Sequence, residues 1–322
     1  MRRSIAAWSP ITFRCVCFTR LRVDRLNQYF VLKHRNQPFA FFFKSQDLIQ
    51  LPLHEPETWP LQWDGGDGIE SGDSYRPGGL HPVRLGDIME SPIGSGDPTP
   101  GQRRYRIVNK LGRGAYSTVW LAQVLDAPTR NYAALKIRTA KADPQHELSV
   151  FKRVGSHPNI MRLRDSFFHS GPNGVHTVLV HDVLGSLLDV VDTKGGRKYA
   201  KTFGRQIAQG LAFLHGQGVV HGGDLVLNVP KCESCVDSLA DIHGGNLGVC
   251  LPTLSEHDLH NILNFFGEPN GIIVFTRASS SAESFPPYLL ESTSIIEYIQ
   301  VKDPSYAAEL LQAQIVDLGN GQ

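Results

Sequence analysis

The feature that most constrains the fold is a pair of β-rich runs joined by a short turn with two glycines. Residues 105–112 read YRIVNKLG and residues 117–125 read STVWLAQVL, and both runs are rich in the β-branched and aromatic residues that favour strands. A third run, YAALKIRTA, begins at Tyr132. Three strands in close succession predict an antiparallel sheet.

The third run carries a lysine, Lys136, among apolar residues. An unpaired ammonium would be costly to bury there, so this lysine requires an anion. Glu147, eleven residues later on the following helix, is one candidate, and the phosphates of a nucleotide are another. Gly112 and Gly114 would let the backbone between the first two runs approach such a ligand without side-chain obstruction.

Helix signals follow the third run. Asp143 and Pro144 are typical of an N-cap and a first helical residue, and Gly155 is typical of a helix end. The run HTVLVHDVL predicts a further strand, and a second amphipathic helix should end at Gly216. The apolar positions that define the two helices are Leu148, Phe151 and Val154 in the first, and Phe203, Ile207, Leu211 and Leu214 in the second.

The N-terminal third lacks such periodicity. The first 25 residues hold six arginines and one acidic residue, which fits either a mitochondrial targeting peptide or a disordered or wrongly assigned leader, and in both cases we expect them outside the fold. From Gln50 to Gln102 the chain is rich in Pro, Gly and Asp, and we expect an extended linker.

Composition excludes several classes of protein. The 32 basic and 31 acidic residues leave a net charge of +1, so bulk electrostatics predict no direct binding of nucleic acid. Five scattered cysteines indicate a reducing compartment, and the Cys232-x-x-Cys235 pair lacks the second pair of a zinc site. No apolar run is long enough for a membrane span, and we expect a soluble monomer.

The ordered motifs resemble a known family. The glycine turn, Lys136, Glu147, HPNI at 157–160 and VDLG at 316–319 resemble the signature of eukaryotic protein kinases. STVWLA, HDVLG at 181–185 and YRPGGLHPVRLGD at 75–87 are similar to the kinases that phosphorylate arginine-serine-rich splicing factors, in their fungal-like form. The resemblance covers about Tyr75 to Gly319.

This resemblance implies an α+β, protein-kinase-like fold. An antiparallel β-sheet small lobe with one helix would precede an incomplete, mostly helical large lobe. The implied divisions are a partly disordered leader and linker at 1–72, an extended approach segment at 73–104, the small lobe and hinge at 105–184, and a partial large lobe at 185–322. Within the last part lie an insert at 223–240 and a spacer at 250–314, in which Leu254, Leu259, Ile262, Leu263 and Phe266 predict an amphipathic helix.

The catalytic loop is interrupted. Kinases place an Asp two residues after a His, and an Asn five residues after that Asp. Without the 18 residues of 223–240, His221, Asp241 and Asn246 have this spacing. Asp224, the competing candidate, is followed by Asn228 one residue too early. We interpret the insert as a translated, unspliced intron.

The resemblance also assigns site residues on the phosphoryl-transfer template. Asp241, Lys136 and Asn246 would be catalytic, Asn246 and Asp317 would bind Mg²⁺, and His181 would be the gatekeeper before a hinge at 182–184. The residues implied to bind ATP are Leu111, Gly112, Arg113, Gly114, Ala115, Tyr116, Ser117, Val119, Lys136, Glu147, Asp182 and Leu184.

The implied activity is transfer of the ATP γ-phosphate to Ser/Thr of proteins, arginine-serine-rich splicing factors among them, in cytoplasm and nucleus. Because the chain stops at Gln322, we expect impaired activity and an uncovered apolar face on the helix of 203–215. One alternative is a pseudokinase or scaffold that binds ATP without transfer. Another is a small-molecule phosphotransferase. Once the insert is removed, the sequence HGDIHGGN resembles the catalytic loop of such enzymes.

Overall fold

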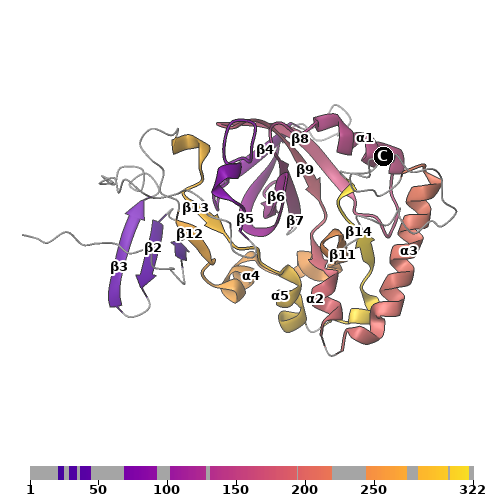
Figure 1. Ribbon diagram of the computed structural model, residues 1–322. Coiled ribbons are helices and arrows are strands. Elements are labelled where there is room, and N and C mark those ends of the chain that lie inside the picture. Colours follow the sequence, from indigo (N-terminus) through magenta and orange to yellow (C-terminus); the bar gives the residue numbers. More distant parts are fainter. Residues whose placement is uncertain are drawn as a thin grey trace, which may run out of the picture.

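The computed structural model (Figure 1) describes most of the chain after residue 68 and three short stretches before it. The described residues are 21–24, 29–34, 37–44, 69–92, 102–127, 131–193, 195–219, 244–273, 282–303 and 305–318. Asp241, His221 and the insert at 223–240 therefore lie outside the described residues, as does the Cys232/Cys235 pair.

The centre of the fold is a six-stranded antiparallel sheet with the strand order β4-β5-β6-β7-β9-β8. The three runs of the sequence form β5, β6 and β7, so the predicted antiparallel small-lobe sheet is confirmed. The strands are β4 (Ile88–Pro92), β5 (Gln102–Gly114), β6 (Ser117–Val124), β7 (Tyr132–Arg138), β8 (Leu163–Gly171) and β9 (Gly174–His181).

Residues of β7 alternate between two environments. Ala133, Leu135 and Ile137 belong to an apolar core that also holds Trp120. Since successive side chains of a strand point to opposite faces, Ala134 and Lys136 lie on the other face. The sheet thus separates an apolar core from a face that carries the buried lysine.

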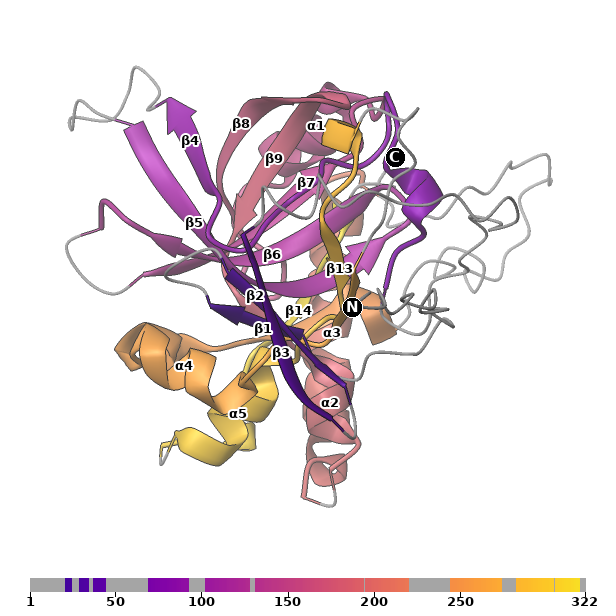
Figure 2. The same cartoon turned by 90° about the vertical axis from the view of Figure 1, so that its left-hand side faces the viewer.

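The sheet curls around this core. β4 and β8 are its two edge strands, yet they approach one another (Figure 2). The hydroxyl of Tyr105 on β5 donates to Asp165 Oδ2 on β8 at 3.1 Å, and the rings of Tyr105 and Phe167 stack with centroids 5.9 Å apart. These contacts nearly close the sheet into a barrel.

Helix α1 (Pro144–Val154) has the predicted boundaries. Asp143 caps it by accepting from the backbone N–H of Gln145 at 2.9 Å, and Gly155 ends it with a φ of 67°. Left-handed backbone is strained for side chains other than glycine, which accounts for this residue at the helix end. The predicted apolar positions Phe151 and Val154 are buried.

The prediction of an extended linker at 50–102 is wrong for residues 69–92. Tyr75 and Leu80 are fully buried, and Ile88–Pro92 pairs with β5 as β4. Turns with glycine and proline separate these apolar residues, so each enters the core on its own. The sequence therefore shows no helical or strand periodicity here. The leader also holds regular structure, since β1 (Leu21–Asp24), β2 (Tyr29–His34) and β3 (Gln37–Lys44) form an antiparallel sheet.

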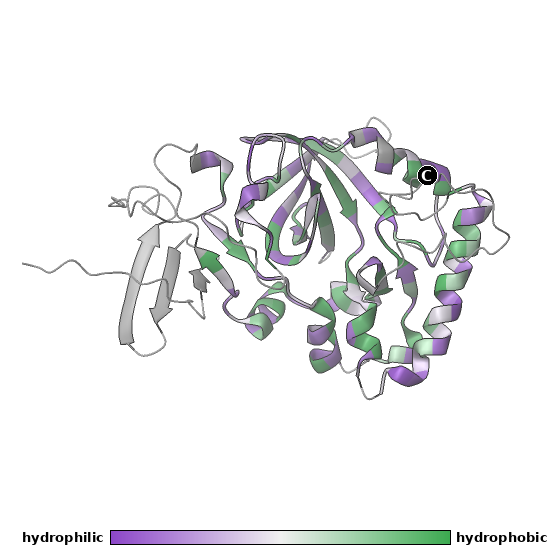
Figure 3. Cartoon of the chain, viewed as in Figure 1, coloured by the Kyte–Doolittle hydropathy of each residue, from purple (hydrophilic) through white to green (hydrophobic). Residues whose placement is uncertain are grey.

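The large lobe contains the second predicted helix as α3 (Ala200–Gly216), which alternates apolar and polar residues along its length (Figure 3). Phe203 and Leu214 are buried. Among the described residues, none of the exposed large apolar side chains lies on α3. The expectation of an uncovered apolar face is therefore wrong, because β14 (Ala313–Ile315) packs against α3 and the ring of Phe213 stacks on His157 with centroids 4.3 Å apart. β14 belongs to a short sheet with the order β10-β11-β14, whose other strands are β10 (Leu184–Ser186) and β11 (Leu247–Cys250).

The spacer packs against both lobes. Its predicted amphipathic helix is α4 (Leu259–Phe266), with Ile262 buried. The other spacer elements are β12 (Gly271–Ile273), β13 (Tyr288–Leu290) and α5 (Ile295–Lys302), and beside α3 the large lobe also holds α2 (Leu187–Val191). Tyr288 and Leu290 of β13 enter the apolar core of the small-lobe sheet. In the described part of the chain, no helix has the length and apolar character needed to cross a bilayer.

A buried ion pair joins three distant segments. Lys110 on β5 pairs with Glu70, and both side chains are almost inaccessible, at 0% and 4% exposed. Lys110 Nζ also donates to the carbonyl oxygen of Leu290 at 2.8 Å, and Tyr75 donates its hydroxyl to Glu70. Burial lowers the pKa of Lys110, although Glu70 opposes this. The approach segment, β5 and the spacer are therefore tied at one point.

Loss of Glu70 should strongly destabilise the fold. Glu70→Ala leaves the ammonium of Lys110 buried without its carboxylate, and we expect unfolding in urea to show a loss of about 3–5 kcal/mol. Asp126→Ala removes the partner of Arg104 in an exposed pair at 2.8 Å and should change the unfolding free energy little. Equal effects of the two variants would contradict this assignment.

Candidate active site

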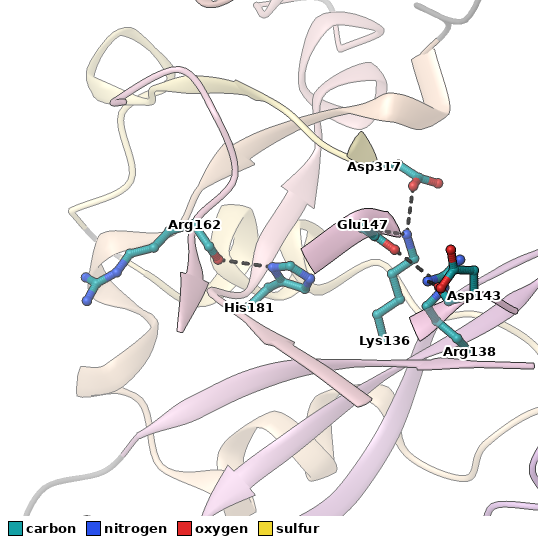
Figure 4. Close-up of polar contacts among 7 residues, drawn as sticks. All are labelled: Lys136, Arg138, Asp143, Glu147, Arg162, His181 and Asp317. Atoms are coloured by element: carbon teal, nitrogen blue, oxygen red, sulfur yellow. Dashed lines mark hydrogen bonds and ion pairs between the residues drawn. The ribbon is translucent and has the colours of Figure 1, made fainter. Parts of the chain in front are cut away.

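Lys136 lies at the centre of the site. Its Nζ donates to Glu147 Oε1 at 2.8 Å, across the space between β7 and α1 (Figure 4). The side chains of Lys136 and Glu147 are 11% and 1% exposed. The eleven-residue connection is therefore long enough to bring the two side chains together.

Asp317 is a second carboxylate on the same ammonium. Its Oδ1 lies 2.7 Å from Lys136 Nζ, although 181 residues separate them in sequence. Burial alone would lower the pKa of Lys136, but the two carboxylates outweigh it and raise that pKa. Asp317 is 46% exposed and has a φ of 58°, a left-handed conformation that Asp tolerates better than most residues. One oxygen of a half-exposed carboxylate is thus held at Lys136.

Arg138 is a site residue that we did not predict. Its Nε lies 3.6 Å from Glu147 Oε2, and its Nη1 donates to the carbonyl oxygen of Asp143 at 2.7 Å. The signal was present in the sequence, because Arg138 follows Lys136 by two residues and must share its face of the strand.

Asn246 and Asp317 lie at the same edge of the short sheet. Asn246 precedes β11 and Asp317 follows β14, and these strands are antiparallel with Leu247 opposite Ile315. The N–H of Val316 donates to the carbonyl oxygen of Asn246 at 2.9 Å, and Asn246 is buried. Carboxylate and amide oxygens suit Mg²⁺, which takes one or two protein ligands beside phosphate oxygens. Within the described ranges, no cluster of three or more His, Cys, Asp or Glu could hold a metal ion by itself.

The glycine turn lies open. Gly112 and Gly114 end β5, opposite Val119 and Ser117 of β6. Neither glycine has a positive φ, and a Cβ atom at either position would come no closer than 3.5 Å to the protein. The fold itself does not require glycine here, whereas a ligand approaching the backbone would. The intervening residues Arg113, Ala115 and Tyr116 are exposed.

The expected hinge follows β9. His181 is buried at the end of this strand, and Asp182 Oδ1 lies 3.7 Å from Arg164 Nε. His181 Nδ1 lies 3.1 Å from the carbonyl oxygen of Arg162, which can only accept, so Nδ1 carries the proton (Figure 4). Burial lowers the pKa of His181 to about 4. The expected ATP-binding residues Leu111 and Val119 pack against the core of the two lobes.

Comparisons with known proteins agree with this architecture. Residues 105–225 match the protein kinase domain family. The chain is 33% identical over 195 residues to the serine/threonine-protein kinase SKY1 of Saccharomyces cerevisiae, covering 54% of this chain and 24% of that protein. It is 35% identical over 170 residues to the serine/threonine-protein kinase SRPK of Physarum polycephalum, covering 47% and 37%. For the SRSF protein kinase 3 of Homo sapiens the identity is 33% over 169 residues, covering 47% and 27%.

Residues 105–225 are therefore similar to the protein kinase domain family, and the similarity to the SR-protein kinases expected from the sequence is confirmed. The antiparallel small-lobe sheet with its one helix agrees with the kinase-like α+β fold. The chain spans between 24% and 37% of the length of these three relatives.

The buried His181 should make the fold sensitive to acid. Its pKa is about 4 in the folded chain against an ordinary value of 6.5, so its contribution to stability is complete above pH 6.5 and is lost as the pH falls from 6.5 to about 4. This loss amounts to roughly 3 kcal/mol. Urea unfolding at several pH values should show a shallower acid dependence for His181→Gln than for the unchanged chain. Parallel pH dependences would contradict the prediction.

Proposed function

We propose that this chain binds ATP with Mg²⁺ and acts as a serine/threonine protein kinase. The observation that carries the proposal is the ammonium of Lys136, held at 2.8 Å from Glu147 and 2.7 Å from Asp317. Such a buried cation beside an open glycine turn suits the phosphates of a nucleotide. The similarity to named serine/threonine kinases supports the same activity.

The proposed binding site combines three parts of the chain. Backbone N–H groups from Gly112 to Ser117 would cover the phosphates, and Lys136 would bind the α and β phosphates. Leu111, Val119 and the hinge residues Asp182 and Leu184 would hold the adenine. ATP supplies the phosphoryl group and Mg²⁺ neutralises charge on it, with Asp317 and Asn246 as the proposed ligands.

Transfer would depend on Asp241, which lies outside the described residues. Its carboxylate would accept the proton of the Ser or Thr hydroxyl while that oxygen forms a bond to the γ phosphorus. The bond to the bridging oxygen breaks, and ADP leaves with the electron pair. Positioning and charge neutralisation matter more in this reaction than the strength of the base.

We propose proteins as phosphate acceptors, and arginine-serine-rich proteins as their specific class. The support is similarity to relatives named SRSF protein kinase and SRPK, of which the chain spans only a part. On the same similarity we propose a cytoplasmic and nuclear location. Imaging of the tagged chain tests this location against the mitochondrial one that the arginine-rich N-terminus suggests.

Nucleotide binding should depend on Lys136. Lys136→Met removes a charge-assisted contact to the phosphates, so we expect the affinity for a fluorescent ATP analogue with Mg²⁺ to fall roughly ten- to hundredfold. Lys152→Met, which removes an exposed lysine of α1, is the matched control and should bind as the unchanged chain does. Failure of the folded, unchanged chain to bind at millimolar concentrations would refute the proposal.

Transfer should be measured separately from binding. We expect the unchanged chain to incorporate phosphate from radiolabelled ATP into a peptide of Arg-Ser repeats, and Asp241→Asn to abolish this while binding is kept. Binding of ATP without incorporation would instead identify a pseudokinase.

A further inference from the structure

Arg138 contacts α1 at two points, the carbonyl oxygen of its N-cap residue and the carboxylate of Glu147. It is the last residue of β7, and its side chain is 12% exposed. Its Nη1 donates to the carbonyl oxygen of Asp143, the residue that caps α1, and its Nε lies 3.6 Å from Glu147 Oε2 (Figure 4). Only residues 139–143 connect β7 to α1. One side chain therefore contacts both the start of the helix and its buried carboxylate.

The two oxygens of Glu147 face two different cations. Oε1 accepts from Lys136 at 2.8 Å, whereas Oε2 accepts no hydrogen bond from a described group and lies near the guanidinium of Arg138. Lys136 and Arg138 balance the two carboxylates Glu147 and Asp317. Glu147 is 1% exposed and Asp317 is 46% exposed, so water can solvate only the second. Glu147 is therefore the carboxylate that requires a neighbouring cation to stay charged in the folded chain.

Arg138 also lies beside the glycine turn. It is paired with Ser117 in the sheet, and the N–H of the next residue, Thr139, donates to the carbonyl oxygen of Tyr116 at 2.9 Å. The cation that faces Glu147 is thus hydrogen-bonded, through the backbone, into the same corner of the sheet as the turn proposed to cover the phosphates.

From this geometry we propose that Arg138 is a positioning residue that neutralises Glu147 independently of Lys136. It holds α1 against β7 and leaves the ammonium of Lys136 free to contact phosphate. The second part of this statement rests on the proposed binding of ATP, whereas the first part does not. A guanidinium suits this task because it stays charged and offers several donors in one plane.

Hydrogen exchange at the backbone N–H groups of α1 tests the proposal without nucleotide. We expect Lys136→Met or Arg138→Gln alone to reduce protection of residues 148–154 only about threefold, because the other cation remains. The double variant should lose at least about tenfold more than the product of the two single effects, since Glu147 is then buried without a cation. Arg104→Gln, which removes an arginine paired with Asp126 on another strand of the sheet, is the matched control.

A third substitution separates charge from simple misfolding. Adding Glu147→Gln to the double variant removes the uncompensated carboxylate, and protection of α1 should rise again. Independent effects of the two single substitutions, or no recovery in the triple variant, would overturn the proposal.

A nucleotide-binding measurement tests the second part of the proposal, that Arg138 leaves Lys136 free to contact phosphate. With the fluorescent ATP analogue and Mg²⁺, Arg138→Gln should bind about tenfold more weakly than Arg104→Gln. Equal binding by these two variants would overturn the link to the phosphates. If the unchanged chain binds no nucleotide, the proposed function fails while the exchange experiment still decides whether Arg138 holds α1.

Discussion

The desolvated ammonium of Lys136 imposes the main constraint on the structure. A buried cation is tolerated only when carboxylates reach it, and here they come from α1 and from the residue after β14. Both segments must therefore be placed to within hydrogen-bond distance of one atom. The five-residue connection, the Asp143 cap and the β11–β14 pairing serve this placement. The two lobes meet through a charge network rather than through apolar packing alone.

The sequence predicted those elements correctly that depend on interactions between neighbouring residues. The helix cap at Asp143, the stop at Gly155 and the alternation of β7 depend on neighbouring residues, so their patterns could be read directly. The candidate partner of Lys136 was also identifiable, because a lysine in an apolar strand demands an anion. The order of the motifs predicted the fold class, and the structure adds the distances between the site residues.

Features that depend on distant residues could not be read in this way. Tyr75 and Leu80 are buried in a cluster with Leu289, more than 200 residues later in the sequence. Lys110 pairs with Glu70, forty residues earlier, and with the carbonyl oxygen of Leu290, 180 residues later. No periodic pattern in the sequence predicts such contacts. Arg138 was missed for a different reason. Its face of the strand was predictable, but the positions of the Asp143 carbonyl oxygen and of Glu147 Oε2 relative to its guanidinium were not.

The core of the small lobe has a consequence for the order of folding during synthesis. Tyr288 and Leu290 complete the same apolar core as Trp120, and the carbonyl oxygen of Leu290 accepts a hydrogen bond from Lys110. The ribosome makes the six strands of the sheet long before it makes this spacer segment. The sheet therefore emerges with one side of its core uncovered and with Lys110 holding Glu70 but lacking its second acceptor, the carbonyl oxygen of Leu290. It can reach its final packing only after residue 290 has left the exit tunnel.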